Sequence, residues 1–183
     1  MENKPSYSSS ERNFILQQGF AEPQPESCPL QYSSLLFQPR LVGLWSLLGV
    51  ILQSPMVFLG LSAVLLWSAF LPRLNPFEAL YNITFAKRPG AIRLTPAPGP
   101  RRFAQGMAGT FALTIGILLV LEWNVAAYTF EAALLMAVAA LAFGKFCLGS
   151  FVFHLLRGRA DFARRTLPWA RGNQTTTEKE TRP

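Results

Sequence analysis

Long apolar blocks joined by short turns dominate the pattern of this chain. Residues 41–71 contain no charged side chain, and residues 103–121 form a second uncharged block. Residues 125–149 form a third block, which holds one glutamate and one lysine. A bilayer core of about 30 Å is crossed by roughly 20 apolar helical residues, so these blocks predict helices that span a membrane.

The first block fits either one long helix or a helical hairpin. As one helix, residues 41–71 would measure about 46 Å, which is well beyond the hydrocarbon core. The tripeptide Gln53-Ser54-Pro55 favours a hairpin, because proline fits the first turn of a helix and disrupts a helix interior. We therefore predict two spans, at about residues 41–53 and 56–71. The first is short for a span, so it either begins earlier or is partly shielded by its neighbours.

The second half of the chain predicts another hairpin. Its spans cover about residues 104–121 and 125–149, and Glu122-Trp123-Asn124 forms the turn between them. Small residues recur every four positions on both spans, as is typical of helices that pack closely in membranes. They are Ala108, Ala112, Gly116, Ala140 and Gly144. The predicted fold class is all-α, a membrane protein with four transmembrane helices arranged as two hairpins.

A basic connector, residues 72–102, joins the two hairpins. Within it, Asn75-Pro76-Phe77-Glu78 is a helix start, with an N-cap residue, a proline at the first position and an acid at the third. The apolar residues that follow share one helical face. We therefore predict a short helix that lies in the membrane interface, ended by Pro89-Gly90.

Polar segments flank the predicted transmembrane domain, which covers residues 37–156. Residues 1–36 are polar and contain several prolines, so they predict a disordered N-terminal tail. Within this tail, Phe14-Ile15-Leu16 could form a transient or docking helix. Residues 157–183 predict a basic, polar C-terminal tail.

Positive charge lies outside the apolar blocks. The net charge is +7, and 15% of the residues are charged, against about 25% in globular proteins. This deficit favours a membrane protein over one that binds nucleic acid, and anionic lipid head groups attract each flanking cation by about 1 kcal/mol. Lysine and arginine concentrate in the connector and after the last span, so both termini and the connector are predicted to be cytoplasmic.

Candidate chemistry gathers at the predicted cytoplasmic end of the spans. Gln105, Lys145 and Cys147 fall at a similar depth there, and a Cys-x-x-Ser pattern runs from Cys147 to Ser150. A cation near a thiol lowers the thiol pKa and favours the nucleophilic thiolate. Cys147, assisted by Lys145 or Gln105, is therefore a candidate catalytic group. The alternative is a structural cysteine beside a lysine whose ammonium reaches the head groups.

The sequence predicts no metal or cofactor site. His154 is the single histidine, so neither a metal site nor a catalytic dyad can be built around it, and Cys28 with Cys147 makes no disulfide framework. Glu131 lies toward the outer end of the last span, about 21 Å along the helix from Lys145. Ionisable groups inside membranes often mark an ion or solute pathway.

Three segments together carry a resemblance to a known family. They are Pro72-Arg73-Leu74-Asn75-Pro76-Phe77, Arg101-Arg102-Phe103-Ala104-Gln105-Gly106 and Phe146-Cys147-Leu148-Gly149. The stretch from about Arg40 to Leu156 resembles the domain-of-unknown-function family 4395, small bacterial integral membrane proteins. Many members have a Cys-x-Gly-Cys-like ending, where this chain has Ser150. The resemblance implies a four-helix domain in a bacterial inner membrane, and it implies no activity.

These observations lead to three functional hypotheses. The first is a non-enzymatic scaffold or accessory subunit of a membrane complex, with a membrane-protein partner or a second copy of the chain. The second is a membrane thiol or sulfur-handling protein that uses Cys147. The third is a small transporter or ion pathway that uses Glu131 and Lys145.

Overall fold

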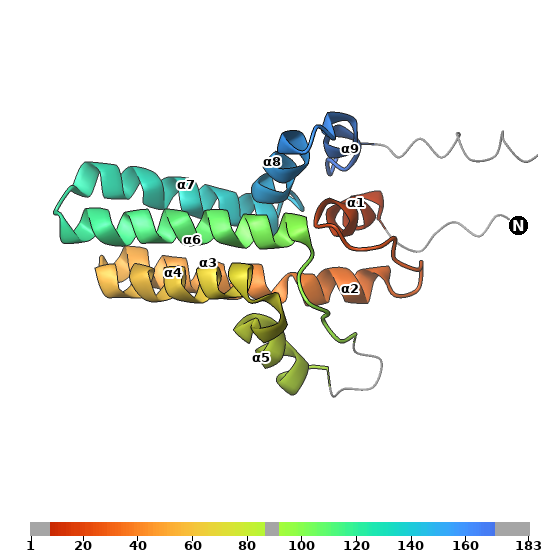
Figure 1. Cartoon of the computed structure of the whole chain (residues 1–183), viewed down its shortest axis with the longest axis horizontal. Coiled ribbons are helices and arrows are strands. Elements are labelled where there is room, and N and C mark those ends of the chain that lie inside the picture. Colours follow the sequence, from red (N-terminus) through yellow and green to blue (C-terminus); the bar gives the residue numbers. More distant parts are fainter. Residues whose placement is uncertain (1–7, 87–91, 171–183) are drawn as a thin grey trace, which may run out of the picture.

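The computed structural model describes residues 8–86 and 92–170, and every regular element in them is helical (Figure 1). The predicted all-α class is therefore confirmed. The disorder predicted for the chain ends falls partly on residues 1–7 and 171–183, which lie outside the described residues. The helix end predicted at Pro89-Gly90 lies outside them as well. The elements are α1 Ser9–Gln17, α2 Cys28–Leu35, α3 Phe37–Leu52, α4 Pro55–Phe70, η1 Pro72–Leu74, α5 Pro76–Thr84, α6 Gly99–Val120, α7 Asn124–Ala142, α8 Leu148–Leu156 and α9 Ala160–Arg165.

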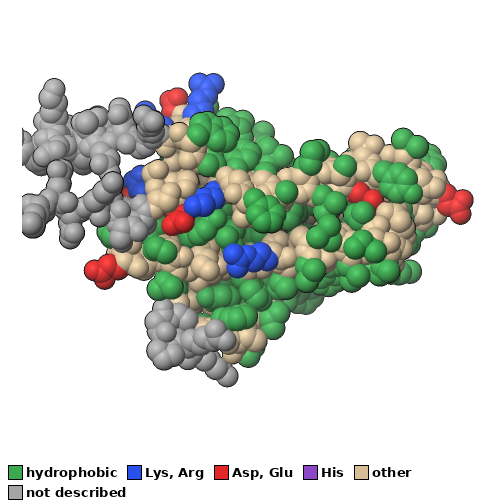
Figure 2. Space-filling view, turned by 180° about the vertical axis from the view of Figure 1, so that it is seen from behind, with side chains coloured by type: hydrophobic (Ala, Val, Ile, Leu, Met, Phe, Trp, Pro, Cys, Tyr) green, Lys and Arg blue, Asp and Glu red, His purple; other side chains and the backbone are tan. Residues whose placement is uncertain are grey.

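Helices α3, α4, α6 and α7 form an elongated bundle (Figure 1). The most extensive contact joins α4 to α6, and α3 packs against both α4 and α7. Three described helical stretches are long and apolar enough to cross a membrane, Cys28–Leu52, Gly99–Val120 and Asn124–Ala142, and Pro55–Phe70 is apolar but shorter. Hydrophobic side chains cover most of the face seen in Figure 2, and its Lys and Arg side chains lie in the half that carries α1, α8 and α9.

The helix break predicted at Gln53-Ser54-Pro55 is present. Helix α3 ends at Leu52, Gln53 takes a left-handed conformation with φ 45°, and Pro55 occupies the first turn of α4. The predicted start of the first span at residue 41 is too late. Helix α3 begins at Phe37 and continues the direction of α2, so the apolar stretch Cys28–Leu52 reaches 25 residues.

Small residues of α6 bring it close to α4. Ala112 is fully buried, and a Cβ placed on Gly116 would lie 2.8 Å from the Leu59 side chain. A Cβ on Gly109 would likewise lie 3.0 Å from Leu66. The small-residue spacing on α6 therefore does support a close helix contact, as expected for membrane bundles. Ala140 and Gly144, the small residues of the last predicted span, do not form such a contact surface on one helix, because α7 ends at Ala142.

The N-terminal segment corrects the expectation of a disordered tail over residues 1–36. Helices α1 and α2 form there, and α1 buries Phe14 and Ile15 completely. The Phe14 ring meets the Tyr32 ring edge-on, with centroids 5.3 Å apart. Asn13 of α1 donates to the backbone carbonyls of Leu167 and Ala170, at 3.1 and 3.2 Å. Low hydropathy misled the prediction because the buried polar side chains of α1 find partners far along the chain.

The last predicted span, residues 125–149, is also corrected. Helix α7 ends at Ala142, and the chain turns through residues 143–147, where Lys145 has a φ of 52°. Helix α8 then begins at Leu148, with Cys147 as its N-cap residue. Figure 1 shows α8 leaving the direction of α7 and lying beside the first turns of α6. Lys145 and Cys147 therefore belong to a connecting turn and not to a continuous helix.

The short helix predicted after Asn75 is confirmed as α5. The Asn75 side chain accepts the backbone N–H of Phe77 at 3.0 Å, and Pro76 occupies the first position. Phe77 and Tyr81 are buried against the bundle, whereas Leu80 and Ile83 are exposed. The C-terminal segment after residue 156 is likewise not all tail, since α9 forms at Ala160–Arg165.

Candidate functional site

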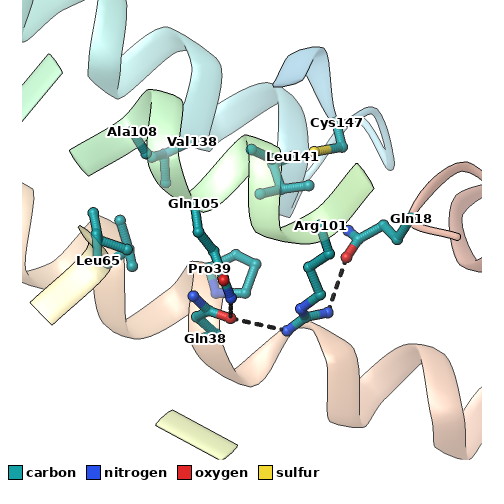
Figure 3. A pocket seen from close by; sticks show the side chains of 12 residues that line it. Gln18, Gln38, Pro39, Leu65, Arg101, Gln105, Ala108, Val138, Leu141 and Cys147 are labelled. Carbon is teal, nitrogen blue, oxygen red and sulfur yellow. Dashed lines mark hydrogen bonds between the residues drawn. The ribbon is translucent and has the colours of Figure 1, made fainter. Parts of the chain in front are cut away.

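A buried arginine organises the polar end of the bundle. Arg101 lies in the first turn of α6 and is 4% exposed. Its guanidinium donates to the side-chain oxygens of Gln18 and Gln38, at 2.9 and 3.1 Å, and to the Leu35 carbonyl at 3.4 Å (Figure 3). Arg101 therefore ties α6 to the segment after α1 and to α2 and α3.

Gln105 lies one helical turn after Arg101 and joins the same network. Its side chain is 5% exposed and donates through Nε2 to Gln38 Oε1 at 2.9 Å. Gln38 Oε1 thus accepts from Arg101 and from Gln105. The Gln38 amide must present its oxygen to Arg101, because its nitrogen cannot accept, and Gln105 must then present its nitrogen to Gln38. Two polar atoms of this network have no hydrogen-bond partner in the described structure, Arg101 Nε and Gln105 Oε1.

A cavity of about 70 Å³ opens between these polar groups and the apolar core. Arg101, Gln105 and Gln38 line one part of its wall, and Cys147 lines another (Figure 3). A second, apolar cavity of about 160 Å³ between α6, α7 and the start of α8 shares Cys147 as a wall residue. Cys147 therefore stands between a polar and an apolar space.

The Cys147 thiol is buried, with 4% of the residue exposed. Burial raises the pKa of this thiol, while hydrogen bonds from Ser150 and the positive charge of Arg101 act in the opposite direction. The backbone N–H of Cys147 donates to Gln17 Oε1 at 2.9 Å, so α1 holds the start of α8 in place. At neutral pH these surroundings keep the thiol protonated.

Lys145 points to α1. Its ammonium donates to Glu11 Oε1 at 3.0 Å and to Ser10 Oγ at 3.3 Å, and it lies 5.0 Å from the centre of the Tyr32 ring. The described contacts of Lys145 thus join the 143–147 turn to the N-terminal segment. The cation whose charge acts on Cys147 is Arg101. Sequence reasoning placed Arg101 among the basic residues of the connector, which were expected to lie near lipid head groups.

Ser150 and His154 line up on α8 toward the same polar end. Ser150 Oγ donates to the Pro100 carbonyl at 3.3 Å, at the start of α6. His154 Nε2 lies 3.0 Å from the Gln17 carbonyl, which can only accept, so this nitrogen carries the proton. Burial lowers the pKa of His154, and its Nδ1 has no partner in the described structure.

Glu78 supplies a carboxyl group near this end. It is 7% exposed on α5, and burial raises its pKa to about 7, while the charge of Arg101 and a hydrogen bond with Asn75 oppose the rise. Across residues 8–86 and 92–170, Arg101 makes no ion pair within 4 Å. Glu78 therefore acts on Arg101 at longer range.

Glu131 lies at the opposite end of the bundle. Its Oε2 accepts from Gln53 Nε2 at 3.2 Å, and its Oε1 is buried without a partner in the described structure. Glu131 and Lys145 therefore do not share a site, and an ion pathway would have to connect two ends of the bundle. The described residues contain no group of three or more His, Cys, Asp or Glu that could hold a metal ion.

The structure brings together three of the residues that the sequence placed at one depth, Gln105, Cys147 and Ser150. Sequence reasoning missed the glutamines that hold them, Gln17, Gln18 and Gln38. Arg101 and Gln105 are four residues apart and so share one face of α6. Arg102 stands beside Arg101 in the same helix, so this spacing alone did not identify the arginine that turns inward. The glutamines carried no local signal, because they come from segments far apart in the sequence.

Comparison with known proteins gives one match. The family model described as Domain of unknown function (DUF4395) matches residues 34–158, which include α3 to α8 and the cavity wall from Gln38 to Cys147. Neither the proteins with curated descriptions nor the solved structures contain a significant match to this chain.

Proposed function

The chain belongs to the DUF4395 family, and we propose that it is a non-enzymatic accessory subunit or scaffold of a membrane complex. One observation carries this proposal. An apolar groove of about 460 Å³ runs along the outside of the bundle between α3 and α7. Its lining includes the small residues Gly43, Ala139 and Ala142 and the exposed leucines Leu44 and Leu47.

Such a groove suits a transmembrane helix of a partner protein. Small residues let two helix backbones approach closely, and close packing replaces the hydrophobic effect as the driving force between helices in lipid. A groove lined by glycine, alanine and larger apolar side chains can accept the ridge of side chains on a partner helix. Arg40 lies at the groove as well and can meet a polar or anionic group at the end of such a helix.

The proposed setting is a bacterial inner membrane, with α3, α4, α6 and α7 crossing as two hairpins. Helix α4 has 16 residues, so its ends rely on neighbouring helices and on local thinning of the bilayer. The half of the bundle with α1, α8 and α9 then faces the cytoplasm, because lysine and arginine favour that side. Helix α5, with Leu80 and Ile83 exposed, lies among anionic head groups.

Substitution of a small residue that lines the groove tests the proposal. Ala139→Leu fills the groove, and Ala132→Leu makes the same change at an exposed α7 position outside it. A photo-crosslinker at Leu47 should trap a defined membrane protein or a second copy of the chain, and Ala139→Leu should abolish the adduct while Ala132→Leu keeps it. A strict monomer that crosslinks only to lipid, or equal adducts in both variants, would contradict a helix partner.

A second candidate function uses the Cys147 thiol. The observation in its favour is that Cys147 lines the cavity together with Arg101 and Gln105. In this arrangement the assisting cation is Arg101 and not Lys145. In a Cys28→Ser background, a reactive Cys147 would label rapidly near neutral pH and slow down in Gln105→Leu. A thiol that resists labelling, or that labels only above its ordinary pKa of about 8.5, removes this candidate.

A further inference from the structure

Arg101 presents an unbalanced charge in the interior. A guanidinium stays protonated at all physiological pH values, and a buried charge is costly unless a partner compensates it. Its hydrogen-bond partners in the described structure are three neutral oxygens, from Gln18, Gln38 and Leu35. The centre of the Phe20 ring lies 5.9 Å from the guanidinium carbon, so the ring compensates part of the charge. The acid that acts on it at longer range, Glu78, titrates near pH 7 and so supplies only part of a negative charge at neutral pH.

The two unpartnered atoms of the network belong to residues that line the same cavity. Arg101 Nε offers an N–H donor and Gln105 Oε1 offers an acceptor, and both residues are more than nine-tenths buried. Their side chains stack on one face of α6, because they are four residues apart. An occupant that reaches both atoms would accept a hydrogen bond from Arg101 Nε and donate one to Gln105 Oε1.

The surrounding backbone favours negative charge in this space. The cavity lies at the first turns of α6 and at the N-cap residue of α8, Cys147. The N-terminus of a helix carries a partial positive charge and stabilises anions. Arg101, in the first turn of α6, and Cys147, at the start of α8, thus line a cavity of about 70 Å³, which exceeds the roughly 10–15 Å³ that one water molecule needs.

We propose that this cavity binds a small monovalent anion that carries its own proton, of which bicarbonate is the simplest example. An anionic oxygen accepts from Arg101 Nε, and the hydroxyl donates to Gln105 Oε1. An ion without a hydrogen, such as nitrate, meets Arg101 equally well and leaves Gln105 Oε1 unpartnered. This site is distinct from the groove between α3 and α7, although Pro39 and Val138 line both.

Bicarbonate and nitrate form a matched pair of probes, since both are planar monovalent ions of four heavy atoms and only bicarbonate has an O–H group. The test measures the unfolding midpoint of the full chain in detergent at pH 8, with either sodium salt at equal ionic strength. At ten times its dissociation constant, bicarbonate should raise the midpoint by about 2–4 °C over nitrate, because nitrate keeps the contact with Arg101 and binds about tenfold more weakly. Equal midpoints would mean that ordered water alone fills the cavity, and would overturn the proposal.

Two variants locate the effect. Gln105→Glu places a carboxylate beside Arg101 and supplies the missing negative charge, so the difference between the two salts should vanish. Gln24→Glu makes the same change at an exposed position and should keep the full difference. A difference that persists in Gln105→Glu would place the ion elsewhere and would also overturn the proposal.

A chemical readout covers the case in which Gln105→Glu does not fold. In the Cys28→Ser variant, which keeps Gln105, Cys147 is the remaining thiol and lines the cavity. Bicarbonate should slow the labelling of Cys147 by a small thiol reagent severalfold relative to nitrate. Equal labelling rates in the two salts would contradict occupancy of this cavity.

Discussion

The side-chain oxygen of Gln17 accepts the backbone N–H of Cys147 at 2.9 Å, so a residue of α1 caps the start of α8. The backbone carbonyl of Gln17 also accepts from His154, two turns further along α8. One residue of the N-terminal helix therefore fixes both the position and the direction of α8. The wall of the Arg101 cavity that contains Cys147 depends on this contact.

Gln17→Leu tests that dependence. The substitution keeps the size of the side chain and leaves the buried Cys147 N–H without an acceptor, which costs about 1–3 kcal/mol of unfolding free energy. Denaturant unfolding should show this loss, and Cys147 should label faster in a Cys28→Ser background. Gln24→Leu changes an exposed glutamine and is the matched control. Identical labelling rates in both variants would show that α1 does not hold the start of α8.

Gly149→Ala tests the contact between α8 and α6. A Cβ at Gly149 would lie 2.6 Å from Ala104 Cα, so a backbone must move to make room. Overpacking of this kind costs about 1–3 kcal/mol, and the thermal midpoint should fall accordingly. Gly106→Ala is the control on α6, since its Cβ would meet nothing nearer than Ala69 at 3.8 Å. A Gly149→Ala protein as stable as Gly106→Ala would contradict this packing.

Glu78→Gln tests the buried carboxyl group. Burial raises the pKa of Glu78 from its ordinary 4.5 to about 7, so the folded state binds this proton more tightly than the unfolded state. The unfolding free energy should therefore fall as the pH rises from about 4.5 to 7, and Glu78→Gln should remove that fall. At pH 8 the variant should exceed wild type by about 3 kcal/mol, because one pKa unit corresponds to about 1.4 kcal/mol. Glu26→Gln, which removes an exposed carboxylate, is the control, and a variant less stable than wild type at pH 8 would refute the prediction.

His154 should act in the opposite direction. Burial lowers its pKa below the ordinary 6.5, so the fold favours the neutral ring. Its stability contribution is complete above pH 6.5 and is lost as the pH falls through the lower, folded-state pKa. His154→Gln keeps a donor for the Gln17 carbonyl and should abolish this acid-side loss in a Glu78→Gln background. Because the chain has a single histidine, its NMR titration gives the pKa directly, and a value at or above 6.5 would contradict the burial argument.

Local signals predicted several elements correctly. The N-cap and proline at Asn75 and Pro76 place the start of α5, and Gln53-Ser54-Pro55 places the break between α3 and α4. Each of these rests on chemistry within a few residues, which a single sequence contains in full. The family resemblance from about Arg40 to Leu156 likewise agrees with the match to residues 34–158.

Other features depended on distant residues and were missed. The turn after Ala142 interrupts the apolar run of residues 125–149, which contains only one glutamate and one lysine. Hydropathy alone therefore favoured a continuous helix. Helix α1 gains its stability from partners 130 or more residues away, among them Cys147 and Leu167. Arg101 belongs to a cluster of basic residues, and only tertiary contacts distinguish the one that turns inward.

The contacts of Asn13 with Leu167 and Ala170 set an order of events during biosynthesis. Helix α1 is translated before α8 and before the segment after α9, which hold the partners of Gln17 and Asn13. Until those segments are made, the polar side chains of α1 cannot form these hydrogen bonds. Helix α1 can therefore reach its final place only after α9 has been translated.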